Sequence, residues 1–463
     1  MENSNISSKK LSRKQLITLG SMLFGLFFGA GNLIFPIHLG QISGGNWAPA
    51  AIGFLLSAVC LPLLAILAIS MTRSDSMYHL ARPVGKGFAL FFLICTHASL
   101  GLLIASPRTA TVSFEIGIIP FISKGQETIA LFIYSAIFFA ITYALSRNQS
   151  KMASYVGKLL NPLLLILLIV VFATAFIIKG DGATLGKIGA MNAGGANMIN
   201  GFLQGYNTMD ALAGLGFGVT IVTALGFFGI TGTSERSKDV AKIGSIAMGI
   251  EAIIYALLIA LGAISTTFTK TTENGAPAFS AIMNHYTGII GTSILAAMAI
   301  IACLTTSIGL VTSFSQDLGK RFPKIGFHKF LIFTCVGGFG IANFGLTRIV
   351  ELSTPILSLL YPFAIGLIFL GIMHPFIGKS KIIYTSTISL TAIPAILDAI
   401  HSMPPYIANL GFFKAINTFA TNYIPWYSIG MDFVPFMAIG LIAGFIIAKL
   451  AGEKATETTA ELN

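Results

Sequence analysis

The chain has 463 residues, of which 55% are hydrophobic and 10% are charged, and its formal net charge is +11. Soluble domains carry about 25% charged residues, so this composition, with a mean hydropathy of +0.84, indicates a polytopic membrane protein. A basic excess can indicate nucleic acid as a partner. Here the basic residues lie in short segments between apolar stretches, and we expect the chain to bind no nucleic acid.

A transmembrane helix needs about 20 mostly apolar residues. The first 14 residues are polar and basic, and the apolar stretch behind them is too long for the core of a signal peptide, so we expect it to remain as the first span. Spans 1, 3, 6 and 8 are longer than one crossing requires, which predicts tilt, extra turns or breaks. In chain order the sequence predicts twelve spans, at 15–43, 47–70, 87–116, 126–146, 152–178, 196–229, 238–266, 287–316, 328–346, 348–373, 381–400 and 431–449.

The distribution of Lys and Arg predicts the orientation of these spans, because both residues favour the cytoplasmic side of a membrane. With the N-terminus inside, the inner segments hold most of the basic residues, and an even number of spans returns the C-terminus to the same side. We therefore expect both termini to be cytoplasmic. The outer segments hold only Lys124, Lys179, Lys187, Lys270, Arg348 and Lys414, while Arg108 lies within span 3.

Span 1 contains an interruption near its middle. Gly25, Gly29 and Gly31 allow the backbone to leave helical geometry, and Asn32 tolerates unusual dihedral angles. Unwinding frees carbonyl groups that suit a small cation, and it exposes N–H groups that suit a carboxylate. The same glycines could serve only close helix packing. A matching interruption elsewhere in the chain favours a binding site.

That second interruption lies in span 6, between Gly205 and Gly214, and it includes Asp210. Broken helices in corresponding positions of two halves indicate the binding site of a transporter, near the bilayer midplane. Five spans separate the two breaks, so the second unit runs opposite to the first. We predict an all-α fold with cytoplasmic tails at 1–14 and 450–463, inverted five-helix repeats at 15–178 and 196–373, and two further helices at 381–449.

Span 8 carries three consecutive hydroxyl groups at Thr305, Thr306 and Ser307 within an apolar sequence. A single hydroxyl would often bond back to its own helix. Three in a row surround more than half of the helix, so at least one faces inward. Together with carbonyls freed at a break, they would form an uncharged oxygen shell that suits Na⁺.

Few charges lie deep in the predicted spans. Arg108 and Asp210 are the deepest, and we expect each to have a partner because an unpaired charge is costly there. Pairing with each other is one possibility. Glu115, Glu251 and Asp317 lie nearer span ends, where a solvated or interfacial role is favoured. His97 could carry a proton, although a packing histidine is the commoner case.

The sequence has no nucleotide-binding glycine loop, no HExxH motif and no Cys/His metal cluster. The hydroxyl groups of span 8 have no adjacent base, which argues against nucleophilic catalysis. We therefore expect a transporter rather than an enzyme, driven by an ion gradient. A channel is the alternative of another class, but it usually needs oligomeric symmetry around a pore.

The run from Phe27 to Pro36, Phe-Phe-Gly-Ala-Gly-Asn-Leu-Ile-Phe-Pro, resembles the signature of the bacterial leucine/isoleucine/valine cation symporter family. The resemblance covers nearly the whole chain. It implies uptake of leucine, isoleucine and valine with Na⁺, or with protons in some members, at the bacterial cell (inner) membrane. It also implies the LeuT-like fold of the amino acid–polyamine–organocation superfamily, with two inverted five-helix repeats. No obligate protein partner is evident.

Sodium symporters of that fold carry Gly-x-Gly-Asn in span 1 and Ala-Gly-Leu-Thr-Ser-Ser-Ile in span 8, and similar stretches here begin at Gly29 and Ala302. The arginine that those symporters place between the break and Phe-Pro is absent, which puts their outer-gate salt bridge in doubt. The resemblance implies Na⁺ ligands at the carbonyl groups of Gly25, Phe28 and Ala302 and the hydroxyl groups of Thr305 and Thr306.

For the substrate, the two breaks supply the candidate residues. We expect the charged groups of the amino acid near Ala30, Gly31, Asn32, Tyr206, Asn207 and Thr208, and its aliphatic side chain near Phe28 and Met209, with Phe24 and Leu212 as further candidates. If protons drive transport instead of Na⁺, the candidates for the titrating group are His97, Asp210 and Glu115.

Overall fold

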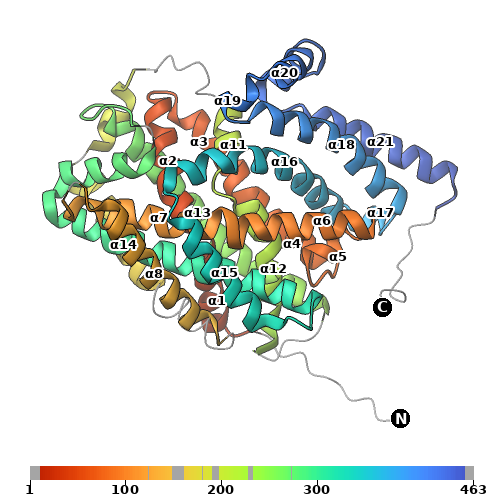
Figure 1. Cartoon of the computed structure of the whole chain (residues 1–463), viewed down its shortest axis with the longest axis horizontal. Helices are drawn as coiled ribbons and strands as arrows, with labels where there is room; N and C mark the ends of the chain where they lie inside the picture. Colours follow the sequence, from red (N-terminus) through yellow and green to blue (C-terminus); the bar gives the residue numbers. More distant parts are fainter. Residues whose placement is uncertain are drawn as a thin grey trace.

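The computed structural model describes residues 11–123, 125–148, 161–179, 181–189, 198–227, 233–272 and 274–453. These residues fold into helices, and no strand occurs among them. Among these residues, eight helices are long and apolar enough to cross a membrane, or nine when one bent pair is taken as a single span. The chain is therefore an all-helical, multi-pass membrane protein, as the composition predicts (Figure 1).

The long helices follow the predicted spans closely, and the α-helices have these bounds: α1 (Arg13–Phe27), α2 (Ala30–Ser43), α3 (Trp47–Leu55), α4 (Leu61–Met71), α5 (Met77–Ala81), α6 (Lys86–His97), α7 (Ala105–Gly117), α8 (Glu127–Ser146), α10 (Asn161–Phe172), α11 (Met198–Tyr206), α12 (Asp210–Phe227), α13 (Thr233–Ser265), α14 (Gly275–Arg321), α15 (Gly326–Ala342), α16 (Leu346–Ile372), α17 (His374–Ile377), α18 (Lys381–His401), α19 (Pro405–Ala408), α20 (Gly411–Tyr423) and α21 (Phe433–Leu450). Spans 9 and 10 are separate helices, α15 and α16, joined by a short turn at Gly345 with φ of 84°.

The predicted number of twelve spans is not decided by helix length. Predicted spans 5 and 9 appear as the shorter apolar helices Pro162–Ile178 and Gly326–Ala342, and span 6 is divided between α11 and α12. The predicted starts of span 5 at 152 and span 6 at 196, and residues 1–10 and 454–463 of the tails, lie outside the described residues. Twelve crossings and the repeat boundaries therefore stay predictions.

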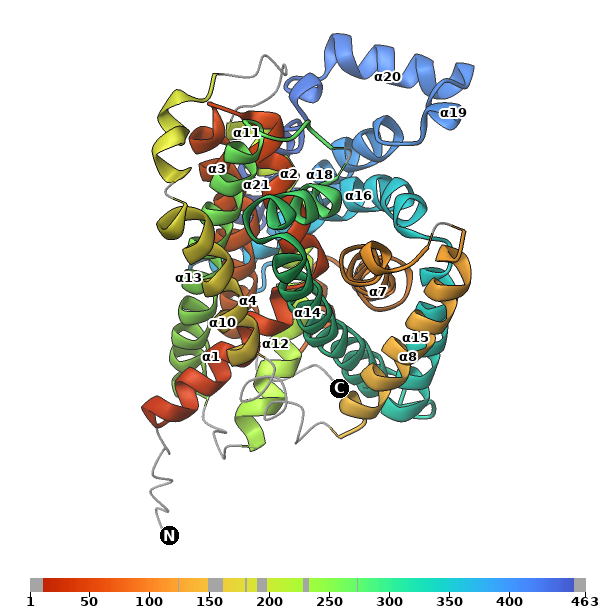
Figure 2. The ribbon, with the colours of Figure 1, turned by 90° about the vertical axis from the view of Figure 1, so that its left-hand side faces the viewer.

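Several spans depart from straight α-helix. α3 and α4 are joined through a π-helical segment at Leu56–Cys60, and α6 and α7 through another at Ala98–Leu103. The helix α14 contains a non-helical residue at Gly288, with φ of 58°, so its first part is a separate helix that precedes the predicted span 8. π-Helical segments often occur at functional sites. Here the second one lies within span 3, whose later part, α7, packs against α14 (Figure 2).

The C-terminal helices form a group at one side of the molecule. α18 packs against both α16 and α21, while α19 and α20 lie at the end of the molecule opposite the start of α1 (Figures 1 and 2). Ala420 is the only buried residue of α20. The segment 401–430 thus contains an exposed helix, rather than a further crossing.

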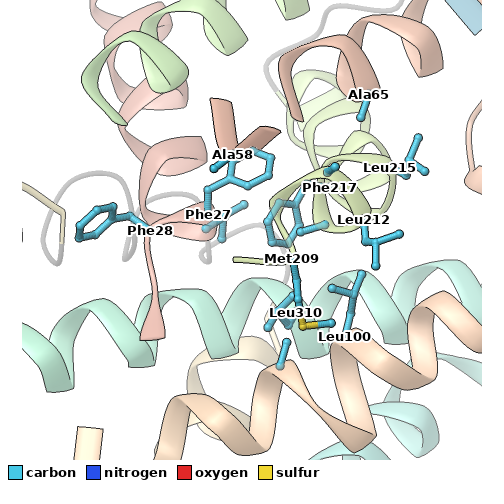
Figure 3. Close-up of a cluster of buried hydrophobic side chains, with 14 of the residues drawn as sticks. Phe27, Phe28, Ala58, Ala65, Leu100, Met209, Leu212, Leu215, Phe217 and Leu310 are labelled. Carbon is cyan, nitrogen blue, oxygen red and sulfur yellow. The ribbon is translucent and has the colours of Figure 1, made fainter. Parts of the chain in front are cut away.

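Apolar side chains from several helices surround the ends of α1 and α12 (Figure 3). The ring of Phe27 packs edge-on against that of Phe217, with 4.9 Å between ring centroids, and both side chains are about 1% exposed. Met209 and Leu310 complete this cluster. The interrupted helices are therefore enclosed by protein, as the absence of water in lipid requires of broken backbone.

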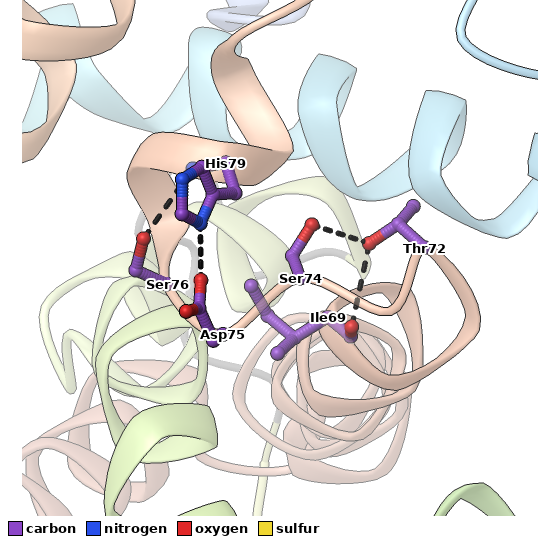
Figure 4. A network of polar contacts seen from close by, with 6 residues as sticks. All are labelled: Ile69, Thr72, Ser74, Asp75, Ser76 and His79. Atoms are coloured by element: carbon purple, nitrogen blue, oxygen red, sulfur yellow. Dashed lines mark hydrogen bonds and ion pairs between the residues drawn. The ribbon is translucent and has the colours of Figure 1, made fainter. Parts of the chain in front are cut away.

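The turn between α4 and α5 is held by short polar contacts (Figure 4). The hydroxyl of Thr72 donates to the carbonyl of Ala68 at 2.7 Å and to the hydroxyl of Ser74 at 2.9 Å. Ser76 caps α5 by accepting from the backbone N–H of His79 at 3.4 Å. The hydrogen bond between His79 and Asp75 lowers the pKa of the Asp75 carboxyl, against an opposing effect of burial. These contacts fix a tight connection between α4 and α5.

The helices α2 and α13 approach each other through glycine. A Cβ atom on Gly262 would lie 2.1 Å from the carbonyl oxygen of Ile37, so no side chain fits there. We expect Gly262→Ala to destabilise the protein by about 1–3 kcal/mol, because the backbones must separate. The matched control is Gly249→Ala on the same helix, where nothing lies within 4 Å. Thermal unfolding in detergent should show a lower midpoint for the first variant only; equal midpoints would contradict the close approach.

Candidate functional site

The predicted break in span 1 is present. α1 ends at Phe27, α2 begins at Ala30, and the two helices are bent by 64°. The N–H of Gly29 donates to the side-chain oxygen of Asn32 at 3.3 Å, so it no longer serves the carbonyl of Gly25. That carbonyl instead accepts from the hydroxyl of Thr306 at 3.3 Å. The break thus replaces a helical hydrogen bond by a contact with span 8.

The predicted break in span 6 is also present. α11 ends at Tyr206 and α12 begins at Asp210, with Met209 between them at φ of 66°. The hydroxyl of Thr208 donates to the carbonyl of Gly205 at 2.8 Å and accepts from the N–H of Asp210 at 3.3 Å. Thr208 therefore caps the start of α12, as Thr commonly does at helix N-termini.

The two breaks face each other. A Cβ atom on Gly31 would lie 3.2 Å from the carbonyl oxygen of Asn207 and 3.0 Å from Nη2 of Arg108. Span 3 therefore places the Arg108 guanidinium beside the backbone of both breaks. A small cavity of about 20 Å³ lies between them, with room for about one or two water molecules. It is lined by Leu26, Phe27, Gly31, Asn32, Leu100, Ala105, Arg108, Thr109, Thr208, Met209, Asp210, Ala213, Phe217, Thr306 and Leu310.

A second, larger cavity of about 530 Å³ lies on another side of the span 6 break. Its walls come from α11, α16, α18 and the segment before α21, and they include Tyr206 and Asn207. Tyr206 stacks on Tyr361 of α16, with 4.1 Å between ring centroids. The residues predicted to contact substrate are thus divided, with Gly31, Asn32, Thr208 and Met209 at the small cavity.

Two further residues predicted to contact substrate are Phe28 and Ala30, and Phe28 lines neither cavity. The ring of Phe28 stacks on Phe24 at 5.1 Å and near Tyr255 at 6.2 Å, while the neighbouring Phe27 lines the small cavity (Figure 3). Ala30 is the first residue of α2, and its side chain is outside the part of the structure described. An apolar wall is therefore present beside the breaks, built from a neighbour of the residue that the sequence indicates.

The residues expected to bind Na⁺ lie at the meeting of spans 1 and 8. Gly25 and Thr306 are in hydrogen-bond contact, and the hydroxyl of Thr305 donates to the carbonyl of Ala302 at 2.9 Å within α14. A Cβ atom on Gly29 would lie 2.6 Å from Cβ of Thr306, so glycine permits this close approach. Carbonyl and hydroxyl oxygens are the ligand type that a hard cation prefers.

A buried polar network adjoins the break, and sequence reasoning missed half of it. The side-chain amide of Asn32 donates to Asp210 at 2.8 Å and to Glu251 at 3.1 Å, and the hydroxyl of Tyr255 is 2.8 Å from both carboxyl groups. Glu251 is fully buried, so the expected solvated role for it is wrong. Its spacing of four residues from Tyr255 on an apolar helix was the available signal.

Two other predictions on buried charges are decided by the structure. Asp317 is 3% exposed and contacts Nε2 of His97 at 2.9 Å, so Asp317 is not solvated and His97 is tied to span 8. Arg108 and Asp210 line the same cavity, but no ion pair joins them within the described residues. Glu115 is half-buried on α7.

The chain matches a known protein family and resembles individual members of it in sequence. Residues 12–451 match the family described as "Branched-chain amino acid transport protein". The chain belongs to this family. One relative, "Branched-chain amino acid permease BrnQ" of Lactobacillus delbrueckii subsp. lactis, is 37% identical over 453 residues, 96% of this chain and 100% of the relative. "Branched-chain amino acid permease BraB" of Bacillus subtilis (strain 168) is 37% identical over 443 residues, 95% and 96% of the two chains. The resemblance inferred from the sequence is confirmed, and these relatives are named permeases rather than enzymes.

Two solved structures share the fold of this transport-family chain. MhsT in complex with L-phenylalanine has a TM-score of 0.56 and 14% identity, covering 96% of this chain and 99% of its own. Mhp1, a nucleobase-cation-symport-1 family transporter in a closed conformation with bromovinylhydantoin bound, has a TM-score of 0.55 and 13% identity, covering 94% and 93%. At such identity the likeness concerns the fold alone.

Proposed function

We propose that this protein is a secondary active symporter that imports leucine, isoleucine and valine together with Na⁺ by alternating access. The substrate class rests on the family and on the names of its permeases. The observation that carries the Na⁺ coupling is the contact of Thr306 with the carbonyl of Gly25, which the break in span 1 releases from its own helix.

Alternating access is supported by the size of the central cavity. At about 20 Å³ it accommodates about one or two water molecules, so it must enlarge to admit an amino acid. The cavity of about 530 Å³ reaches the other face of the same break and is in the range of ligand-binding cavities. In this proposal it is the outer vestibule, from which substrate enters when α11 moves.

The same proposal includes the membrane arrangement. Twelve helices, ten of them in two inverted five-helix repeats at 15–178 and 196–373, would place both breaks at the midplane. The fold shared with MhsT and Mhp1 supports it. The excess of Lys and Arg in inner segments supports cytoplasmic termini in a bacterial inner membrane.

Leucine uptake into proteoliposomes across a Na⁺ titration tests the coupling. We expect Thr306→Ala to raise the Na⁺ concentration for half-maximal uptake about 10-fold, since one oxygen ligand is lost at a cost of about 1–3 kcal/mol. Thr306→Ser is the matched control, because it keeps the hydroxyl and should stay near the wild type. Wild-type uptake indifferent to Na⁺ at fixed pH and voltage would refute the proposal.

A proton-coupled carrier of the same fold is the second candidate. Tyr255 has one O–H hydrogen, yet its oxygen is 2.8 Å from both Asp210 and Glu251. The second short contact requires another hydrogen, which one of the carboxyl groups can supply. Uptake driven by a pH gradient without Na⁺ would favour this candidate.

A further inference from the structure

Arg108 is a buried cation that has no ion-pair partner among the described residues. The residue is 2% exposed, and none of the ion pairs between described residues involves it. Its Nε atom has no hydrogen-bond acceptor. Its guanidinium carbon lies over the ring of Phe35, 5.2 Å from the ring centroid. A charge buried in this way costs several kcal/mol unless it is paired.

The position of Arg108 indicates what could pair with it. Nη2 points to the backbone of Gly31 at the start of α2, where the N–H groups at a helix N-terminus also favour an anion. Asp210 does not pair with Arg108 in this arrangement: its Oδ2 atom accepts from Asn32 and Tyr255, and no ion pair with Arg108 occurs among the described residues. Arg108 and the first turn of α2 thus form one site for a negatively charged group.

The other walls of the small cavity add a carboxyl group and an apolar surface to the Arg108 cation. Asp210 supplies a carboxyl on the same cavity, and Phe27, Leu100, Met209, Phe217 and Leu310 supply an apolar surface (Figure 3). A cation, an anion and an apolar wall around one space match a zwitterionic amino acid with an aliphatic side chain. Inorganic anions such as chloride would use only the first of the three.

We infer that Arg108 binds the α-carboxylate of the transported amino acid, against the N-terminus of α2 and facing Asp210 across the cavity. This inference rests on the proposed function. A guanidinium binds a carboxylate through two parallel hydrogen bonds, which gives orientation as well as affinity.

Competition with [³H]leucine binding to the purified protein, in Na⁺-containing buffer, tests the inference. The competitors are leucine, leucinamide, which lacks the charged carboxylate, and 4-methylpentanoate, which lacks the amine. In the wild type we expect leucinamide to bind at least about 30-fold more weakly than leucine. In Arg108→Gln leucine should weaken by about that factor while leucinamide changes little, so that the preference disappears. Arg108→Lys keeps the positive charge but cannot make two parallel hydrogen bonds, so it should retain part of the preference for leucine.

The matched control is Arg348→Gln, because Arg348 is exposed near the start of α16 and lines neither of the two cavities. If leucinamide binds the wild type as tightly as leucine, the inference is wrong whether or not the variants fold. Equal weakening of leucine and leucinamide in Arg108→Gln also overturns it. Wild-type protein that binds leucine without preferring it to leucinamide refutes this inference alone. Wild-type protein that neither binds nor transports any branched-chain amino acid refutes the proposed function and the inference with it.

Discussion

Gly29→Ala is expected to abolish Na⁺-driven leucine uptake while the protein still inserts and purifies normally. The added Cβ would lie 2.5 Å from the hydroxyl oxygen of Thr306 and 2.6 Å from its Cβ, distances that side chains do not tolerate. The break in span 1 must then move away from span 8. This separates the carbonyl of Gly25 from the hydroxyl of Thr306, the contact on which the proposed Na⁺ site depends.

The measurement is the initial rate of uptake at saturating Na⁺, with expression and size-exclusion profiles recorded for each variant. Gly340→Ala is the matched control, because nothing lies within 4 Å of its added Cβ. The double variant Gly29→Ala with Thr306→Gly removes the clash, so it should transport no worse than Thr306→Gly alone. Such non-additivity is the expected sign of direct contact. Additive losses would show that Gly29 acts through something other than Thr306.

The sequence predicts the interruptions well because their physics is local. Glycine and asparagine within a long apolar stretch indicate a backbone that leaves the helix, and the breaks occur at Gly29 and at Met209 as expected. Three adjacent hydroxyl groups in span 8 likewise indicate an inward-facing polar patch, and Thr306 contacts span 1. These features depend on residues close together in the chain.

Features that depend on how distant spans pack could not be predicted. Glu251 looks like a residue near a helix end until α13 is placed against α2, where it meets Asn32. Asp317 similarly gains His97 only when spans 3 and 8 are packed. Phe27 rather than Phe28 lines the small cavity. Which of the two side chains faces it depends on the residue at which α1 ends, because a shift of one residue there turns the side chains around the helix axis.

The second large effect concerns the two neighbouring carboxyl groups of Asp210 and Glu251, which both contact Tyr255. We expect Asp210→Asn to lower leucine uptake by on the order of 100-fold, whereas Glu251→Gln should keep it within about 10-fold of the wild type. Asp210 lines the cavity and is the first residue of α12, where the helix dipole favours a carboxylate. Glu251 lies within α13 and its Oε2 has no hydrogen-bond partner, so a proton is accommodated there and a neutral amide can replace it.

Initial rates at several pH values, with and without Na⁺, provide the comparison, and Glu251→Ala shows whether the contact with Asn32 and Tyr255 matters apart from charge. Loss of the hydrogen bonds should make Glu251→Ala much worse than Glu251→Gln. If Glu251→Gln is instead as damaging as Asp210→Asn, the proton on the pair must leave and return during transport. Wild-type uptake should then follow a pH gradient in the absence of Na⁺, and the oxygen shell at Thr306 would be a packing contact between two helices. Because the two outcomes assign the coupling ion to different atoms, this pair of substitutions separates the symport candidates more sharply than either ion titration alone.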